Sequence, residues 1–168
     1  MLAILAKPAL PLPVTGLTNE LTTDDPSVQQ ATRVYDRFEP LFGSFKLHTV
    51  EGQVCSKHIN GGGLVALTAR VEPTVFVAEG AAILDRADVR DQVRVEDHAI
   101  IDGDARVTGR SRLRHETHVG DQAVLEERVL MQRHASVGGN AHLRGMISLD
   151  YYVFVGDESR LFGNMHLE

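Results

Sequence analysis

VRVEDHAIIDGDARVTGRSRL, residues 93–113, is the stretch that decides the fold of this chain. Within it, Val95, Ile101, Val107 and Leu113 lie six residues apart, and a small or β-branched residue lies two positions before each of them. A period of six fits neither an α-helix, which repeats every ~3.6 residues, nor a simple β-strand, which repeats every two. The pattern therefore indicates a series of six-residue structural units.

The same period continues in both directions from this stretch without a miss. No single unit of this size buries its own apolar residues, so such units gain stability by stacking on one another. A hexapeptide repeat of this length predicts a parallel β-helix. An apolar residue stands at seventeen successive positions: Val71, Val77, Ile83, Val89, Val95, Ile101, Val107, Leu113, Val119, Leu125, Met131, Val137, Leu143, Leu149, Val155, Leu161 and Leu167.

Each hexad is interpreted as a short strand followed by a corner. If the repeated apolar residue and the residue two before it point inward, their sequence neighbours point to solvent, because side chains alternate across a strand. The second position after the apolar residue is Gly or Asp in ten of the sixteen complete repeats. Both residue types tolerate left-handed backbone geometry, which predicts that the chain turns there.

Two longer segments carry a resemblance to a known family. Residues 59–89 read INGGGLVALTARVEPTVFVAEGAAILDRADV, and residues 137–164 read VGGNAHLRGMISLDYYVFVGDESRLFGN. The run resembles the hexapeptide-repeat superfamily, and within it the YdcK-like bacterial and phage proteins. The resemblance covers residues 45–168 and implies an all-β fold: a left-handed parallel β-helix of about five to six coils, each made of three hexads. That group is described as transferases without an agreed reaction, so the resemblance is specific for fold and says little about function.

The length of 168 residues fits one domain, which the pattern divides into two parts. Residues 1–23 are expected to form an extended, proline-rich arm. Asp24 and Pro26 have the residue types of a helix start, and apolar residues follow at helical spacing. We therefore expect an arm and a short capping helix over residues 1–44, followed by the hexapeptide-repeat β-helix over residues 45–168.

Composition narrows the classes of partner. The net charge of −6 argues against nucleic acid or an acidic membrane surface as an obligatory partner. The sequence contains no stretch of eighteen apolar residues, so it predicts no membrane-spanning helix. The first fourteen residues are apolar but contain three prolines and lack a basic segment, so they make a poor signal peptide. Cys55 is the single cysteine, which excludes a disulfide framework and makes a cytoplasmic location the expectation.

An eighteen-residue coil places positions that differ by eighteen above one another. One face of the predicted rod is then apolar or small almost throughout, which is typical of a contact surface. The resemblance implies a homotrimer, whereas the alternative is that scattered apolar surface residues need no explanation. The candidate interface residues are Leu84, Ile100, His118, Gly120, Gly138 and Phe154.

The candidate catalytic residues are histidines. Hexapeptide acyltransferases use a histidine as the general base at a groove between subunits, and acetyl-CoA or another acyl-CoA supplies the acyl group. By resemblance, His118 is the first choice for this base and His115, at a corner close by, is the second. The alternative is that His118 only fills the interface with an amphipathic side chain.

Two other clusters have a functional and a structural interpretation. His98, Glu116 and His134 are expected in one corner column, where they form a polar ladder or, alternatively, hold a metal. His98 and His134 are two coils apart, about 10 Å between backbones, so one ion does not bridge them and no metal site is expected. Arg110 and Arg128 are expected to be stacked, which makes them candidates for binding an anion, with solvated surface arginine as the alternative.

The unbroken register decides the functional hypothesis. Transferases of the superfamily interrupt their coils with a loop that closes over substrate, whereas this repeat continues from Val71 to Leu167 without an insertion. We therefore favour a non-enzymatic, oligomeric binding or assembly module that presents a rigid face to a protein partner or a small anionic ligand, without a cofactor. The alternative is an acyl-CoA-dependent acyltransferase with an intersubunit active site.

Overall fold

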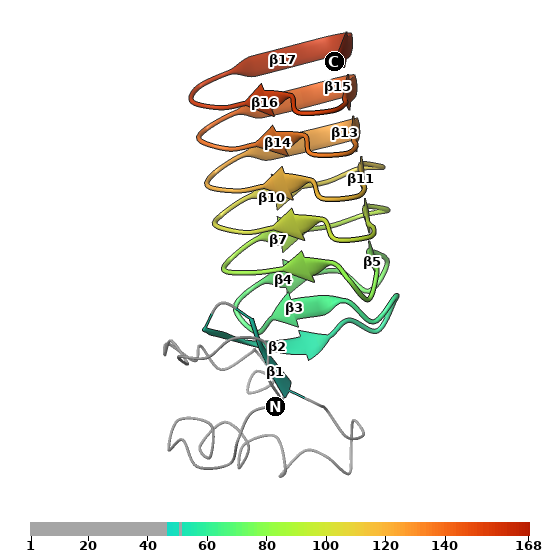
Figure 1. Ribbon diagram of the computed structural model, residues 1–168, viewed down its shortest axis with the longest axis vertical. Coiled ribbons are helices and arrows are strands. Elements are labelled where there is room, and N and C mark those ends of the chain that lie inside the picture. Colours follow the sequence, from blue (N-terminus) through green and yellow to red (C-terminus); the bar gives the residue numbers. More distant parts are fainter. Residues whose placement is uncertain (1–46, 51) are drawn as a thin grey trace, which may run out of the picture.

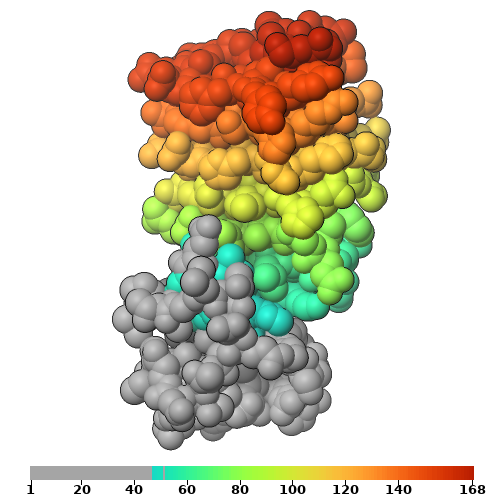
Figure 2. Space-filling model, in the orientation of Figure 1, coloured from blue at the N-terminus to red at the C-terminus, as the bar shows by residue number. Residues whose placement is uncertain are grey.

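The chain coils around one long axis into a rod. A computed structural model describes residues 47–50 and 52–168, and they form an all-β parallel solenoid of about six turns. Figure 1 shows these turns stacked along the axis, and in Figure 2 each turn forms one layer of the rod. The predicted arm and capping helix lie outside the described residues. Within the described ranges there is no helix that could span a membrane.

The first face of the rod is an eight-stranded sheet. Its first three strands pair antiparallel, β1 with β2 and β2 with β3, and every later pair is parallel. The antiparallel strands end the solenoid at its N-terminal side, where β2 covers the edge of β3. In pairing order the strands are β1 (Leu47–Val50), β2 (Gln53–Lys57), β3 (Leu64–Ala66), β6 (Ala82–Ile83), β9 (Ile100–Ile101), β12 (His118–Val119), β14 (Ser136–Val137) and β16 (Phe154–Val155).

The second and third faces belong to one sheet. The second face contains β4 (Arg70–Val71), β7 (Asp88–Val89) and β10 (Arg106–Val107), and the third contains β5 (Phe76–Val77), β8 (Arg94–Val95) and β11 (Arg112–Leu113). In the last turns both faces are formed by single eight-residue strands that continue through the corner between them, so that β13 pairs with both β10 and β11. These long strands are β13 (Val124–Met131), β15 (His142–Leu149) and β17 (Arg160–Leu167).

The register confirms the eighteen-residue coil. Ile100 pairs with His118 and His118 with Ser136 on the first face, each partner being eighteen residues further on. On the third face Arg112 pairs with Leu130 in the same way. The columns of side chains expected from the sequence therefore exist along the parallel strands.

The repeated apolar positions form a core that runs along the axis. From Val77 to Val155 each of these residues is buried, whereas Val71, Leu161 and Leu167 are partly exposed because they lie in the terminal turns. Burial of one such side chain stabilises the fold by about 1.5–3 kcal/mol before chain entropy is subtracted. Stability therefore comes from the stacking of coils rather than from any one coil.

Corner aspartates join successive coils. Asp85 and Asp121 have positive φ angles of 53° and 56°, which places them in the left-handed region. Each carboxylate accepts a hydrogen bond from the backbone N–H eighteen residues further on: Gly103 donates to Asp85 at 3.0 Å and Gly139 donates to Asp121 at 2.8 Å. A corner aspartate thus turns its own coil and satisfies a backbone donor of the next one.

This double role predicts how a corner substitution affects stability. Asp121→Ala removes the acceptor and puts a Cβ-bearing residue without a compensating side chain in the left-handed region, so we expect a loss of about 2 kcal/mol in the free energy of unfolding. Asp121→Asn keeps an oxygen acceptor and a residue that tolerates this geometry, so the loss should be under about 1 kcal/mol. Urea denaturation measures both values. Equal losses for the two variants would contradict the assigned role.

Candidate functional site

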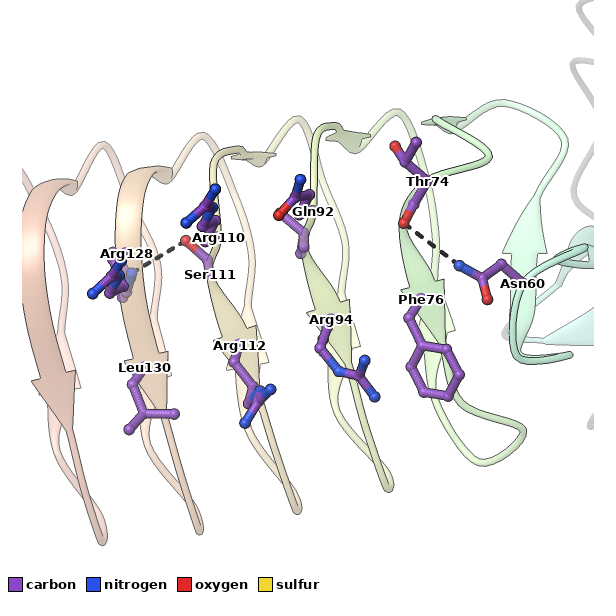
Figure 3. Close-up of a pocket in the computed structure, with 12 residues that line it drawn as sticks. Asn60, Thr74, Phe76, Gln92, Arg94, Arg110, Ser111, Arg112, Arg128 and Leu130 are labelled. Carbon is purple, nitrogen blue, oxygen red and sulfur yellow. Dashed lines mark hydrogen bonds between the residues drawn. The ribbon is translucent and has the colours of Figure 1, made fainter.

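A groove of about 530 Å³ runs along the rod axis at the corner that precedes the third face. Figure 3 shows its two walls as parallel rows of side chains. One wall is the corner row of Thr74, Gln92, Arg110 and Arg128, and the other is the strand row of Phe76, Arg94, Arg112 and Leu130. Val93, Ser111 and Val129 lie between the rows, and Asn60 lies at the N-terminal end.

The floor of the groove is tied together by hydrogen bonds. The fully buried Ser111 hydroxyl donates to the carbonyl oxygen of Thr108 at 3.1 Å and accepts from the backbone N–H of Val129 in the next coil at 3.2 Å. At the N-terminal end, the side-chain amide of Asn60 reaches the carbonyl oxygen of Thr74 at 3.5 Å. These contacts tie neighbouring coils together along the groove.

The groove is positively charged. Among residues 47–50 and 52–168, four arginines and no acidic residue line it, although the whole chain has a net charge of −6. Arg94 pairs directly with Arg112 across adjacent strands, a like-charge arrangement that is destabilising. Among the described residues, Arg110, Arg112 and Arg128 have no carboxylate partner; the guanidinium of Arg128 instead contacts the sulfur of Met146 at 4.0 Å.

Arg94 is held in place by two neighbours. Its Nε donates to Glu96 at 2.7 Å, and its guanidinium lies over the ring of Phe76, 4.5 Å from the centroid. Glu96 also accepts from Arg114 at 2.7 Å. Burial alone would raise the pKa of Glu96, but the hydrogen bonds and positive charges of Arg94 and Arg114 outweigh it and hold that pKa below its usual value. Glu96 is therefore ionised at neutral pH and fixes the Arg94 side chain.

A second polar site lies on the first face. Asp102 Oδ2 and His118 Nε2 are 2.8 Å apart, and both side chains are partly exposed. Gly120 provides the space for them, because a Cβ at that position would lie 2.5 Å from Asp102 Oδ1 and 2.9 Å from a ring carbon of His118. A carboxylate that orients an imidazole in this way is the arrangement that general-base catalysis uses.

The predicted interface residues do not form one exposed patch. Ile100 pairs with His118 on the neighbouring strand. Phe154 is 70 % exposed, and its ring lies over Gly156, which is in the same column as Gly138. Leu84, in contrast, is only 1 % exposed. It was expected at an exposed interface, but it belongs to the buried hydrophobic cluster and offers almost no surface to another chain.

His115 and the polar corner have structural partners. The backbone N–H of His115 donates to Asp97 at 3.0 Å, and its Nδ1 accepts from the N–H of Arg133 at 3.4 Å, so this residue links three coils. Glu116 and His134 Nδ1 are 3.2 Å apart, and the His134 ring stacks on Tyr152 at 4.8 Å.

The third member of that corner, His98, forms no hydrogen bond with Glu116 or His134 within the part of the chain that the structure describes. In the same part of the chain, no group of three or more His, Cys, Asp or Glu side chains is placed to hold a metal ion. The thiol of Cys55 is a poor nucleophile, because burial raises its pKa to about 12 and keeps it protonated at neutral pH.

The sequence reasoning missed three residues of these sites. Asp102 escapes a reading based on stacking, because stacking relates positions eighteen apart and its contact with His118 spans sixteen. Arg94 and Arg112 carry no motif of their own that separates them from other surface arginines. The signal that identifies them is the absence of acidic residues from both rows of the groove.

Comparison of the sequence with protein-family models found no match, and no curated protein matches it either. The structure confirms the architecture that the repeat predicts: a parallel β-solenoid in which strands pair every eighteen residues.

Proposed function

We propose that this chain is a non-enzymatic, oligomeric binding module of the hexapeptide-repeat type, whose rigid rod binds a small anionic ligand in the arginine-lined groove. One observation carries the proposal: the described residues that line a groove of about 530 Å³ include four arginines and no carboxylate, in a chain with a net charge of −6. A surface that only needed solubility would distribute these charges among acidic neighbours, as the pair of Arg114 and Glu96 does.

The size and chemistry of the groove favour a small ligand. Its volume lies within the range of about 300–1,000 Å³ that is typical of small-molecule sites. Arginine presents a planar fork of donors that matches carboxylate and phosphate groups in a bidentate manner. Because Arg110, Arg112 and Arg128 have no carboxylate partner among the described residues, they offer these donors without first breaking an ion pair.

The first face is the proposed contact between copies of the chain. Phe154, which is 70 % exposed, and the partly exposed Ile100 supply the apolar surface for this contact. We propose a homotrimer, as in the family that the repeat resembles. With Leu84 in the core, this contact is concentrated on the middle and C-terminal turns.

The second candidate function is an acyl-CoA-dependent acyltransferase with its active site between subunits. The observation that favours it is the Asp102–His118 pair at 2.8 Å on the proposed contact face. In that reaction His118 would take the proton of an acceptor hydroxyl or amine, and Asp102 would hold the imidazole in place.

The anion site is tested by titrating the protein with a panel of anions. We expect tripolyphosphate, citrate or orthophosphate to raise the melting temperature in a manner that weakens with added sodium chloride, because attraction between partly exposed charges is screened. Arg128→Gln should lower the affinity for the anion at least about tenfold, as expected for loss of a charge-assisted contact, so the rise in melting temperature should be smaller at each anion concentration. Arg106→Gln, on the second face, is the matched control and should leave the shift unchanged. No response to any anion would reject this function.

The contact face is tested by light scattering. Ile100→Lys and Phe154→Lys each place a charge in an apolar contact, so both variants should elute with the mass of a monomer while the parent chain has that of a trimer. Phe162→Lys is the control, because Phe162 is also exposed but lies on the long strand β17. An unchanged mass in both test variants would remove the proposed interface.

The transferase function is tested by release of the CoA thiol from acetyl-CoA in the presence of hydroxyl and amine acceptors. The binding module should release none. Acetyl transfer that falls at least about 100-fold in His118→Ala and survives Arg128→Gln would instead establish the enzyme and the role of His118 as a base. Asp102→Asn should then reduce the rate while leaving acetyl-CoA binding intact.

A further inference from the structure

The positive charge of the groove is gathered at one end. Figure 3 shows Arg110, Arg112 and Arg128 toward the C-terminal turns and neutral side chains, Asn60 and Thr74, toward the N-terminal turns. A ligand that fills this groove therefore needs an anionic part and a neutral part. An extended acidic peptide, which spreads its charges along its length, does not match this distribution.

The anionic end is built for more than one charged group. Arg110 and Arg112 lie in one coil and Arg128 in the next, and neighbouring coils are separated by about 4.8 Å. A chain of phosphoryl groups that lies along the rod axis presents oxygen atoms to both coils at once. A single phosphate or carboxylate has fewer oxygen atoms to share among three guanidinium groups. The number of arginines therefore favours a diphosphate or triphosphate chain.

At the other end of the groove the stacked Phe76 ring and Arg94 guanidinium form a flat surface, and the charge of Arg94 is balanced by Glu96. The Arg94 guanidinium lies 4.5 Å from the centre of the Phe76 ring and is fixed by its 2.7 Å hydrogen bond to Glu96. Guanidinium and aromatic planes both stack on aromatic rings. The side-chain amides of Asn60 and Gln92 lie in the same part of the groove and offer both donors and acceptors.

We infer that the groove binds a nucleoside diphosphate or triphosphate, with its phosphates between Arg110, Arg112 and Arg128 and its base against the Phe76–Arg94 pair. This inference rests on the proposed anion-binding function and adds the ligand class and its orientation. The ribose lies between the two ends, near Gln92 and Ser111. No chemical step is required, so the ligand leaves the groove unchanged.

Isothermal titration calorimetry of the full chain tests the inference. The probes are ATP, tripolyphosphate and orthophosphate, all at one ionic strength and without divalent cations. We expect ATP to bind at least about tenfold more tightly than tripolyphosphate, and tripolyphosphate at least about tenfold more tightly than orthophosphate, since each step adds contacts.

Variants at the two ends separate the two parts of the site. Arg128→Gln should weaken ATP and tripolyphosphate alike. Phe76→Leu keeps an apolar side chain but loses the ring, so it should weaken ATP about tenfold and leave tripolyphosphate unchanged. Arg106→Gln is again the control for net charge, and urea denaturation shows that each variant is folded. If Phe76→Leu proves unstable, Asn60→Ala tests the same end.

The outcomes distinguish this inference from the proposed function. ATP that binds no more tightly than tripolyphosphate, or that is insensitive to both Phe76→Leu and Asn60→Ala, overturns the nucleoside assignment and leaves anion binding in place. Orthophosphate that binds as tightly as tripolyphosphate overturns the phosphate chain. If none of the three probes binds, and citrate does not raise the melting temperature, the anion site itself is rejected.

Discussion

Backbone hydrogen bonds between successive coils are the constraint on which the rest of the structure depends. Arg94 N–H donates to the carbonyl of Ser111 at 3.0 Å, and Gly120 N–H donates to that of Val137 at 2.9 Å, each reaching seventeen residues ahead. One such bond contributes only about 0.5–1.5 kcal/mol net. Their register is nevertheless firmly set, because a slip of one residue would move the apolar positions from the core to the surface.

This ladder needs a corner after every hexad, and glycine and aspartate supply most of these corners. Glycine adopts the left-handed geometry without cost at positions such as Gly109, whose added Cβ would lie 2.3 Å from the carbonyl oxygen of Glu127. Aspartate adopts it at positions such as Asp121 and accepts a hydrogen bond from the next coil. The strand β13 continues through its corner, where Glu127 has a φ of 71°, and Arg128 on this strand extends the groove beyond Arg110.

The sequence predicts what the backbone repeat determines and misses what side chains do across it. The core, the first-face column of Ile100 and His118 and the ion pair of Glu96 with Arg114 all follow from spacings of six and eighteen. The Asp102–His118 contact runs diagonally over a glycine, so no repeat spacing reveals it. The burial of Leu84 also escaped prediction, because the repeat places this residue on the outward side of its strand and carries no information on what covers it.

The arginines of the groove depart from a pairing rule that the same two strands obey two residues away. Glu96 lies opposite Arg114 and forms an ion pair with it, whereas Arg94 lies opposite Arg112 with no acidic residue between them. Because the backbone ladder fixes the distance between coils, the strands cannot move apart to relieve this repulsion. A sequence able to place a carboxylate at position 96 was equally able to place one at 112, which would have stabilised the rod. A local departure of this kind, in which Arg94 is paired with Glu96 but Arg112 has no carboxylate partner among the described residues, is expected where binding rather than stability determines the residue.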